Sequence, residues 1–177
     1  MIAGLALALM LAHAAAAPPA GREFIPGPQG QADWDQIEKD PDAAASLLAG
    51  AAVAAGCLMP FKTQTSAAAY AAHATKVGQA MKARSPKIAA LPFTLEGVHG
   101  DTCQVTYHGA HVDELWKTFG EFRANPTSGD CTEAPATPGR IGVECKAAAN
   151  APAFRETIER AGAGITIAFT WLGSKAR

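Results

Sequence analysis

The stretch LPFTLEGVHGDTCQVTYH, residues 91–108, has two runs of alternating apolar and polar residues on either side of a short turn. Alternation with a period of two is typical of half-buried strands, so the stretch predicts an antiparallel hairpin. Opposed residues share a face, and Gly100 supplies a left-handed conformation, so the predicted loop is 98–100. Pro92 marks the first strand as an edge strand. The predicted pairs are Leu91 with Tyr107, Phe93 with Val105, and Leu95 with Cys103.

The segments around this hairpin also have recognisable periods. Two helices are expected before it, one starting at the cap Asp40-Pro41 and ending near Cys57 ahead of Pro60, and one over 65–84. A third helix is expected over 111–123, from an apolar stripe at three- and four-residue spacing. A short strand is expected near 129–133 and a longer one near 140–147. A last helix from Asn150 would bury Phe154, Ile158 and Ala161 and stop at Gly162, and a strand with Ile165, Ile167, Phe169 and Trp171 inward would follow.

This order of elements predicts the fold class. In sequence it runs helix, helix, strand, strand, helix, strand, strand, helix, strand. Partial segregation of helices and strands favours an α+β domain with a mainly antiparallel sheet of about five strands and about four helices. The single domain is expected over 33–177, with an acidic turn or helix near 33–40. Residues 18–32, rich in proline and glycine, are expected to be irregular.

The first 17 residues predict export. An apolar run followed by Ala12-His13-Ala14 and further alanines is typical of the core and cleavage zone of a signal peptide. The run is too short to span a bilayer, and no cysteine follows the cleavage zone, so no stable membrane anchor is expected. No Lys or Arg precedes the run, which leaves two alternatives open: a start upstream of Met1, or an uncleaved apolar tail. The expected location is the bacterial periplasm or the outside of the cell.

Cysteine usage agrees with export. Four cysteines and no C-x-x-C pair predict two disulfides rather than a redox motif or a zinc ribbon. Three pairings are possible. The layout of the predicted strands favours Cys131–Cys145 across a hairpin, which leaves Cys57–Cys103 to tie the first helix to the sheet. The second link closes a loop of about 46 residues and is worth about 4 kcal/mol in the chain-entropy model.

The charges are nearly balanced but unevenly placed. Fifteen basic and 16 acidic residues give a net charge of −1, which favours neither nucleic acid nor an anionic membrane as a partner. No acidic residue lies between Ala43 and Leu95. The five cations of that stretch predict either the solvent-exposed side of a helix or a contact with an anionic surface such as lipid headgroups or an acidic protein. They are Lys62, Lys76, Lys82, Arg84 and Lys87.

Three histidines and an aspartate are the candidate metal ligands. His99 lies on the predicted hairpin loop, His108 ends the second strand, and His111 and Asp113 begin the next helix. Imidazoles and a carboxylate at one corner are ligands that zinc or copper accepts. The competing interpretation is a polar strand-to-helix corner with Asp113 near the positive end of the helix dipole.

No sequence motif indicates catalysis. The chain has no G-x-S-x-G, H-E-x-x-H, S-x-x-K or P-loop motif. The sequence therefore predicts a non-catalytic binding or accessory module without a cofactor, with a protein of the cell envelope as the expected partner. The alternative is a metal-binding protein or enzyme that uses His108 and His111.

Overall fold

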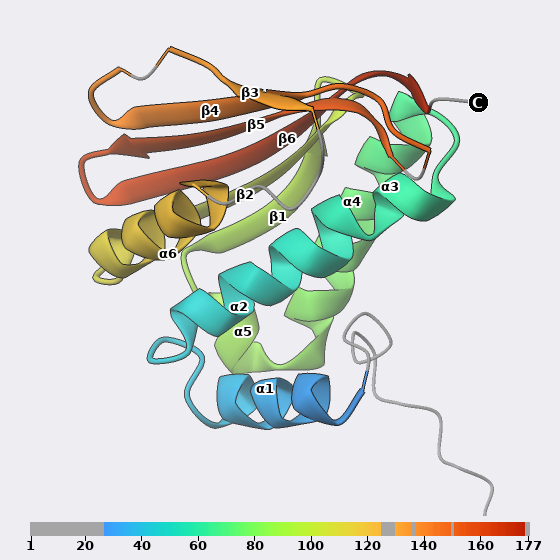
Figure 1. Ribbon diagram of the computed structural model, residues 1–177. Coiled ribbons are helices and arrows are strands. Elements are labelled where there is room, and N and C mark those ends of the chain that lie inside the picture. Colours follow the sequence, from blue (N-terminus) through green and yellow to red (C-terminus); the bar gives the residue numbers. More distant parts are fainter. Residues whose placement is uncertain (1–26, 125–129, 136, 150, 176–177) are drawn as a thin grey trace, which may run out of the picture.

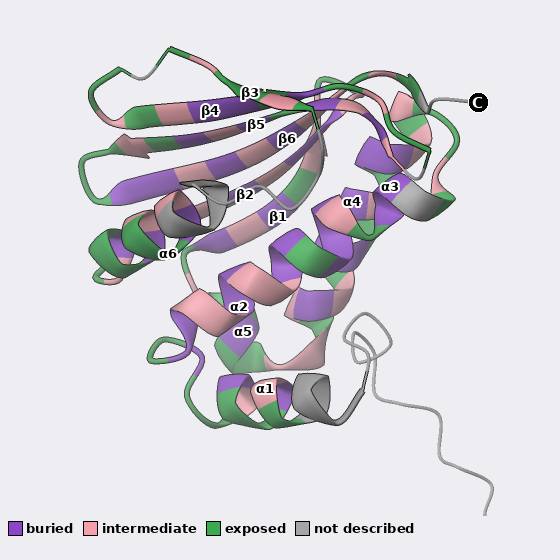
Figure 2. Cartoon of the chain, viewed as in Figure 1, coloured by how far each residue is buried: buried purple, intermediate pink, exposed green. Residues whose placement is uncertain are grey.

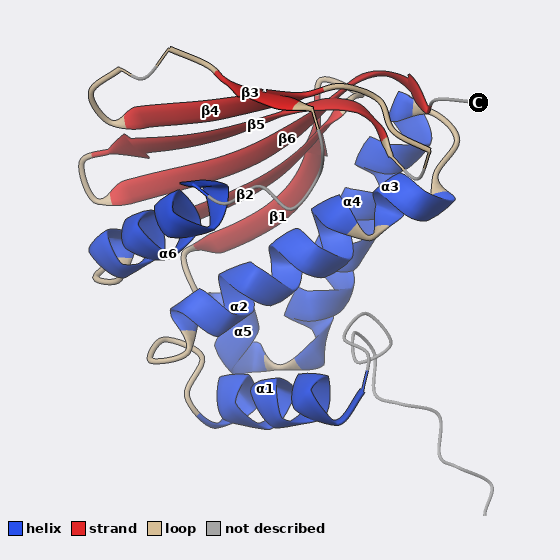
Figure 3. Cartoon of the chain, viewed as in Figure 1, coloured by secondary structure: helices blue, strands red, loops and turns tan. Residues whose placement is uncertain are grey.

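A computed structural model describes residues 27–124, 130–135, 137–149 and 151–175. One antiparallel sheet forms one layer, and the helices lie together on one side of it (Figures 1 and 3). The helical segments are α1 (Gly27–Lys39), α2 (Ala45–Ala52), the π-helix η2 (Val53–Leu58), α3 (Pro60–Thr63), α4 (Ala67–Arg84), α5 (Pro86–Ala90) and α6 (Val112–Ala124). The strands are β1 (Phe93–Val98), β2 (Thr102–His108), β3 (Cys131–Glu133), β4 (Arg140–Cys145), β5 (Pro152–Ala161) and β6 (Gly164–Lys175).

The predicted α+β class with an antiparallel sheet is confirmed. The sheet has six strands in the order β1-β2-β6-β5-β4-β3, so the last strand of the chain lies at its centre. Buried residues occur in both the sheet and the helices (Figure 2), and they form one hydrophobic core. The favoured cysteine pairing is also confirmed: Cys57 in η2 is linked to Cys103 in β2, and Cys131 is linked to Cys145 across β3 and β4.

The hairpin of β1 and β2 is present, but its predicted register is wrong by two residues. Leu95 pairs with Val105 and Phe93 with Tyr107, so the loop comprises residues 99–101. His99 and Gly100 both have positive φ, 54° and 76°. A shift of two residues keeps every side chain on its predicted face, so the apolar pattern cannot distinguish the two registers. The turn conformation, which His99 shares with Gly100, decides between them.

The predicted helix from Asn150 is wrong in the described segment, because 152–161 is strand β5. Phe154, Glu156 and Ile158 alternate with more exposed residues and face the helices. Phe154 and Ile158 also fit a helical spacing, which is why the sequence is ambiguous here. Backbone pairing with β4 on one side and β6 on the other selects the strand. Gly162 (φ 58°) is therefore not a helix stop but the first residue of a two-residue hairpin loop.

The N-terminal helices also differ from the prediction. α1 begins at Gly27, inside the segment expected to be irregular, while 18–26 lie outside the described residues. The Asp40 carboxylate accepts a hydrogen bond from the Ala43 amide (3.2 Å), but it caps a turn, and α2 begins only at Ala45. Pro60 does not end the helical path: it occupies the first turn of α3, where its missing N–H removes no hydrogen bond.

The edge strand β1 is covered by α4. Gly78 of α4 lies so close to β1 that a Cβ atom there would overlap the Leu95 carbonyl oxygen. A Cβ atom at Gly97 of β1 would overlap the Ala71 carbonyl oxygen, and the Gly97 amide donates a hydrogen bond to Thr75 Oγ1 (2.9 Å). The edge position of β1, predicted from Pro92, is confirmed. α4 shields part of the β1 backbone from pairing with a further strand.

Aromatic side chains fill the end of the core where α3, α4, β5 and β6 meet. Phe61 stacks on Tyr70 with ring centroids 4.9 Å apart and lies equally close to Phe154. Tyr70 is fully buried, and its hydroxyl donates a hydrogen bond to the Phe169 carbonyl (3.4 Å). Burial raises the pKa of Tyr70 well above its ordinary value, because the anion would lose its hydration. Tyr70 is therefore a neutral part of the core.

Candidate functional site

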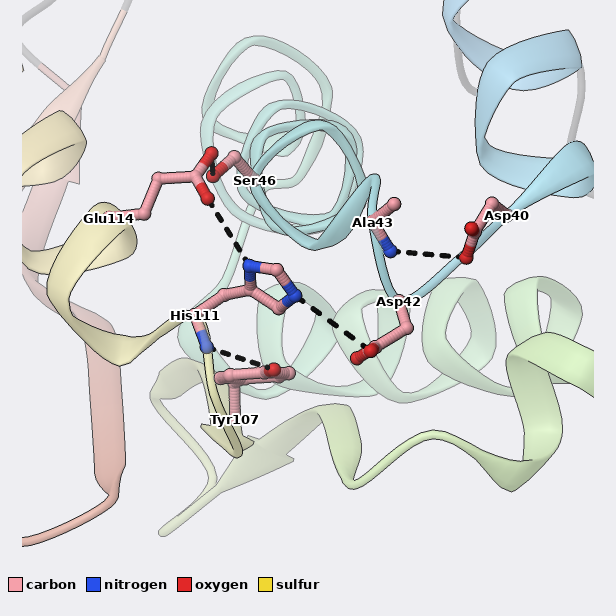
Figure 4. Close-up of polar contacts among 7 residues, drawn as sticks. All are labelled: Asp40, Asp42, Ala43, Ser46, Tyr107, His111 and Glu114. Atoms are coloured by element: carbon pink, nitrogen blue, oxygen red, sulfur yellow. Dashed lines mark hydrogen bonds and ion pairs between the residues drawn. The ribbon is translucent and has the colours of Figure 1, made fainter.

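A cluster of polar side chains joins the start of α2 to the start of α6, and we call it the His111 clasp (Figure 4). His111 Nδ1 lies 3.3 Å from Glu114 Oε2, and Nε2 lies 3.8 Å from Asp42 Oδ2. The His111 amide donates a hydrogen bond to the Tyr107 hydroxyl (3.4 Å). The Ser46 hydroxyl donates to Glu114 Oε1 (2.5 Å), so both oxygens of that carboxylate are engaged.

The His111 clasp lacks the arrangement of a nucleophile and its base. A serine nucleophile needs its hydroxyl to donate to an imidazole. The Ser46 hydroxyl instead donates to Glu114. The two carboxylates of the clasp are mostly hydrated, since the side chains of Asp42 and Glu114 are 65% and 54% exposed. The clasp is best explained as a surface contact between two helices.

We expect His111→Ala to lower the free energy of unfolding by about 0.5–1 kcal/mol, because polar contacts to hydrated carboxylates at the surface are weak. Urea denaturation of the purified protein measures this change. Lys117→Ala, at an exposed position on the same helix, is the matched control and should change stability less. Equal effects of the two substitutions would show that the clasp does not stabilise the contact between α2 and α6.

The four predicted metal ligands do not come together. His99 and His108 lie at opposite ends of β2, about 20 Å apart at the usual rise per residue. His108 packs against Gly164 at the β5–β6 turn, whereas His111 belongs to the clasp. Asp113 of α6 instead forms an ion pair with Arg160 of β5 (2.6 Å). Within the described part of the chain, no three His, Cys, Asp or Glu side chains are grouped so that they could hold a metal ion.

The basic stretch does not form one cationic surface. The Arg84 side chain is only 1% exposed, lies 4.3 Å from the centre of the Trp34 ring, and forms an ion pair with Glu38. Lys87 Nζ donates a hydrogen bond to the Lys39 carbonyl at the end of α1 (3.1 Å). Two of the five cations therefore hold α1 in place. Of the others, Lys76 is exposed, Lys82 is half-buried, and the side chain of Lys62 lies outside the described part.

The sheet face away from the helices, which we call the open face, is lined mainly by threonines and charged residues. The strand registers place its side chains in three rows across the sheet. The first row is Thr94, Thr106, Thr166, Glu159 and Arg140. The second is Glu96, Gln104, Ala168, Thr157 and Gly142. The third is Val98, Thr102, Thr170, Arg155 and Glu144. No described helix covers these rows (Figure 3).

Hydrogen bonds and an ion pair order the side chains of the open face. The hydroxyls of Thr102 and Thr170 lie 3.1 Å apart on neighbouring strands. Arg155 donates to Glu144 Oε2 through both Nε (3.1 Å) and Nη2 (2.8 Å). No Phe, Tyr or Trp side chain of the described strands points to this face. The face therefore presents hydroxyls, an amide and charges of both signs.

Sequence reasoning missed the open face, although part of the signal was present. In β2 and β6, threonines alternate with large apolar residues, as at Thr166-Ile167 and Phe169-Thr170. The apolar residues of this alternation predict the buried face, but the alternation alone does not show that the threonines of separate strands form one surface. The set exists only because β6 inserts beside β2, a pairing of segments far apart in the sequence.

A hollow of about 380 Å³ opens beside the Cys131–Cys145 disulfide. Its walls are formed by Cys145, Lys146, Ala147, Ala148, Ala151 and Phe154, with Asp130 at the rim. Lys146 and Asp130, whose side chains are 78% and 82% exposed, lie 3.9 Å apart. Neither forms a fixed polar anchor, so the described lining of the hollow lacks the convergent polar groups of a small-molecule site.

Two further observations bear on function. Among the described helices, none combines the length and the apolar character needed to cross a membrane. Comparisons of the chain with protein families, with curated proteins and with solved structures found no match.

Proposed function

We propose that this chain is an exported, non-catalytic module that binds a protein of the cell envelope through the open face. The observation that carries the proposal is this broad polar surface on a rigid sheet, uncovered by any described helix. Two disulfides support an oxidising compartment, since such links persist mainly outside the cytosol.

The chemistry of the open face favours a protein partner. Phosphate-rich ligands need several unpaired cations, but Arg155 is already bound to Glu144. Lipid tails and sugar rings pack on apolar or aromatic groups, and of the large apolar side chains on this face only Leu172 is exposed among the described residues. Hydroxyls, an amide and charges of both signs suit the polar rim and hydrogen bonds of a protein interface.

Site-specific photo-crosslinking in a bacterial periplasmic extract tests the proposal. We expect a crosslinker at Thr166, in the middle of the open face, to join the mature protein to a protein partner. A crosslinker at Lys76, exposed on α4, is the matched control and should give no such product. Excess unlabelled protein should compete, whereas Thr106→Arg, which puts a large cation beside Thr166, should not.

Two results would contradict the proposal. One is the absence of any product at Thr166. The other is a product that forms equally at Lys76 or is competed equally by Thr106→Arg. Alkylation of thiols after denaturation without reductant tests the oxidising compartment separately, because a protein with both disulfides offers no thiol to label.

A further inference from the structure

The two disulfides have contrasting surroundings. Cys57 and Cys103 are both fully buried and join η2 to the inner face of β2, beneath the helix layer. Cys131 is half-buried and lies in β3, the outermost strand of the sheet. A dissolved thiol can approach this outer link without opening the core, whereas the inner link requires the core to open first.

The outer link joins a short edge strand to β4, its one neighbour among the described strands. β3 consists of three residues, and Thr132 and Glu133 are exposed. Its pairing with β4 continues for one hydrogen bond at each end, from the Ala134 amide to the Gly142 carbonyl (2.9 Å) and from the Lys146 amide to the Asp130 carbonyl (3.1 Å). The Thr132 hydroxyl donates a further hydrogen bond to the Glu144 carbonyl (3.4 Å). A strand this short gains little stability from pairing alone, so the covalent link adds a strong restraint to it.

The hollow described above gives a path to this link. Cys145 forms part of its wall, and the ion pair of Lys146 with Asp130 lies at its exposed rim. The hollow and the exposed rim set the outer link apart from the buried Cys57–Cys103 link.

We propose that Cys131–Cys145 is a reduction site for an external dithiol and that the disulfide acts as a latch on the edge of the sheet. One thiolate of the dithiol attacks Cys145 Sγ from the hollow, and Cys131 leaves as a thiolate and takes up a proton. The second thiol of the dithiol then attacks the dithiol's sulfur in the mixed disulfide, and Cys145 leaves as a thiolate and takes up a proton. The protein gains two electrons and two protons, and the dithiol becomes a cyclic disulfide.

Reduction changes which backbone is exposed. In the oxidised protein, β3 covers the outer edge of β4 near Val143 and Cys145. Once released, β3 leaves the amides and carbonyls of β4 as the edge of the sheet. The inner link stays closed, so the core and the other sheet edge, which α4 covers, are unchanged.

The test treats the native protein, with both disulfides intact, with dithiothreitol at about 1 mM and without denaturant. Alkylated cysteines are then identified by peptide mass spectrometry. We expect Cys131 and Cys145 to be labelled at least about a hundredfold faster than Cys57 and Cys103. Amide exchange in β3 and the outer edge of β4 should rise about tenfold, with β2 and β6 unchanged. Cys131→Ser with Cys145→Ser should reproduce this exchange pattern without reductant.

Three results would overturn the proposal. The first is resistance of the outer link to the dithiol. The second is labelling of all four cysteines at one rate, which indicates global unfolding. The third is selective reduction with unchanged exchange in β3, which shows that the strand stays paired without its link.

Discussion

Replacing Gly97 by alanine is expected to lower the free energy of unfolding by about 3 kcal/mol. At this position β1 and α4 approach each other backbone to backbone, so an added Cβ atom would overlap the Ala71 carbonyl oxygen. The added Cβ atom meets main-chain atoms of Ala71, so no flexible side chain can move aside to make room for it. The strand must shift away from α4, which also weakens the hydrogen bond from the Gly97 amide to Thr75 Oγ1. Thermal denaturation should show a midpoint lower by about 10 °C.

A second glycine supplies a matched comparison. Gly78 lies inside α4, where alanine ordinarily stabilises a helix by about 1 kcal/mol. We expect Gly78→Ala to destabilise nonetheless, because its Cβ atom would overlap the Leu95 carbonyl oxygen. Gly50→Ala in α2 meets no atom within 4 Å and should stabilise the protein by about 0.5–1 kcal/mol. Stabilisation by alanine at Gly78 as well would mean that the helix and strand are not in contact.

Replacing Arg84 by alanine is expected to lower the free energy of unfolding by about 3 kcal/mol. The guanidinium is buried between α1 and α4, where it lies over the Trp34 ring and forms an ion pair with Glu38. Its removal opens a cavity beneath Trp34 and deletes the cation–π contact, which is strongest when both groups are desolvated. Urea denaturation measures the total effect, and amide exchange should rise in α1 more than elsewhere.

Lys82→Ala is the control for Arg84, since both cations lie in the last turn of α4. Lys82 is only half-buried, so its truncation should change stability by no more than about 0.5 kcal/mol. Arg84→Lys keeps the charge but loses the planar group that stacks on the indole, and should fall between the two. Equal stability of the Arg84→Ala and Lys82→Ala variants would exclude Arg84 as an anchor for α1.

The contacts of Arg84 show why the basic stretch is only partly predictable. The sequence places five cations between Ala43 and Leu95 and contains no acid there. The ion-pair partner of Arg84 is Glu38, 46 positions earlier, and its aromatic partner lies in the same helix, α1. A helical period shows which side chains share a face but not which other helix will cover that face. A solvated cation and a buried cation on one helix, such as Lys76 and Arg84, therefore have the same local sequence pattern.

The metal hypothesis failed for a related reason. His108 and His111 are close in sequence, yet the turn between β2 and α6 sends one toward the β5–β6 hairpin and the other toward α2. Asp113 is engaged by Arg160 of β5, a strand that was predicted to be a helix. Neighbours in the sequence converge on a metal only if the backbone between them holds both side chains toward one point.

By itself, the sequence determined which residues face the core in the β1–β2 hairpin and in β6, the edge position of β1, and the more favourable cysteine pairing. These features depend on local alternation, on one proline and on the spacing of four sulfurs, all of which act over short stretches of chain. Only the tertiary structure decided that 152–161 is a strand, that β1 and β2 pair two residues out of the predicted register, and that Arg84 is buried. In each case the local pattern fits two conformations, and the choice between them comes from hydrogen bonds and packing with segments distant in the sequence.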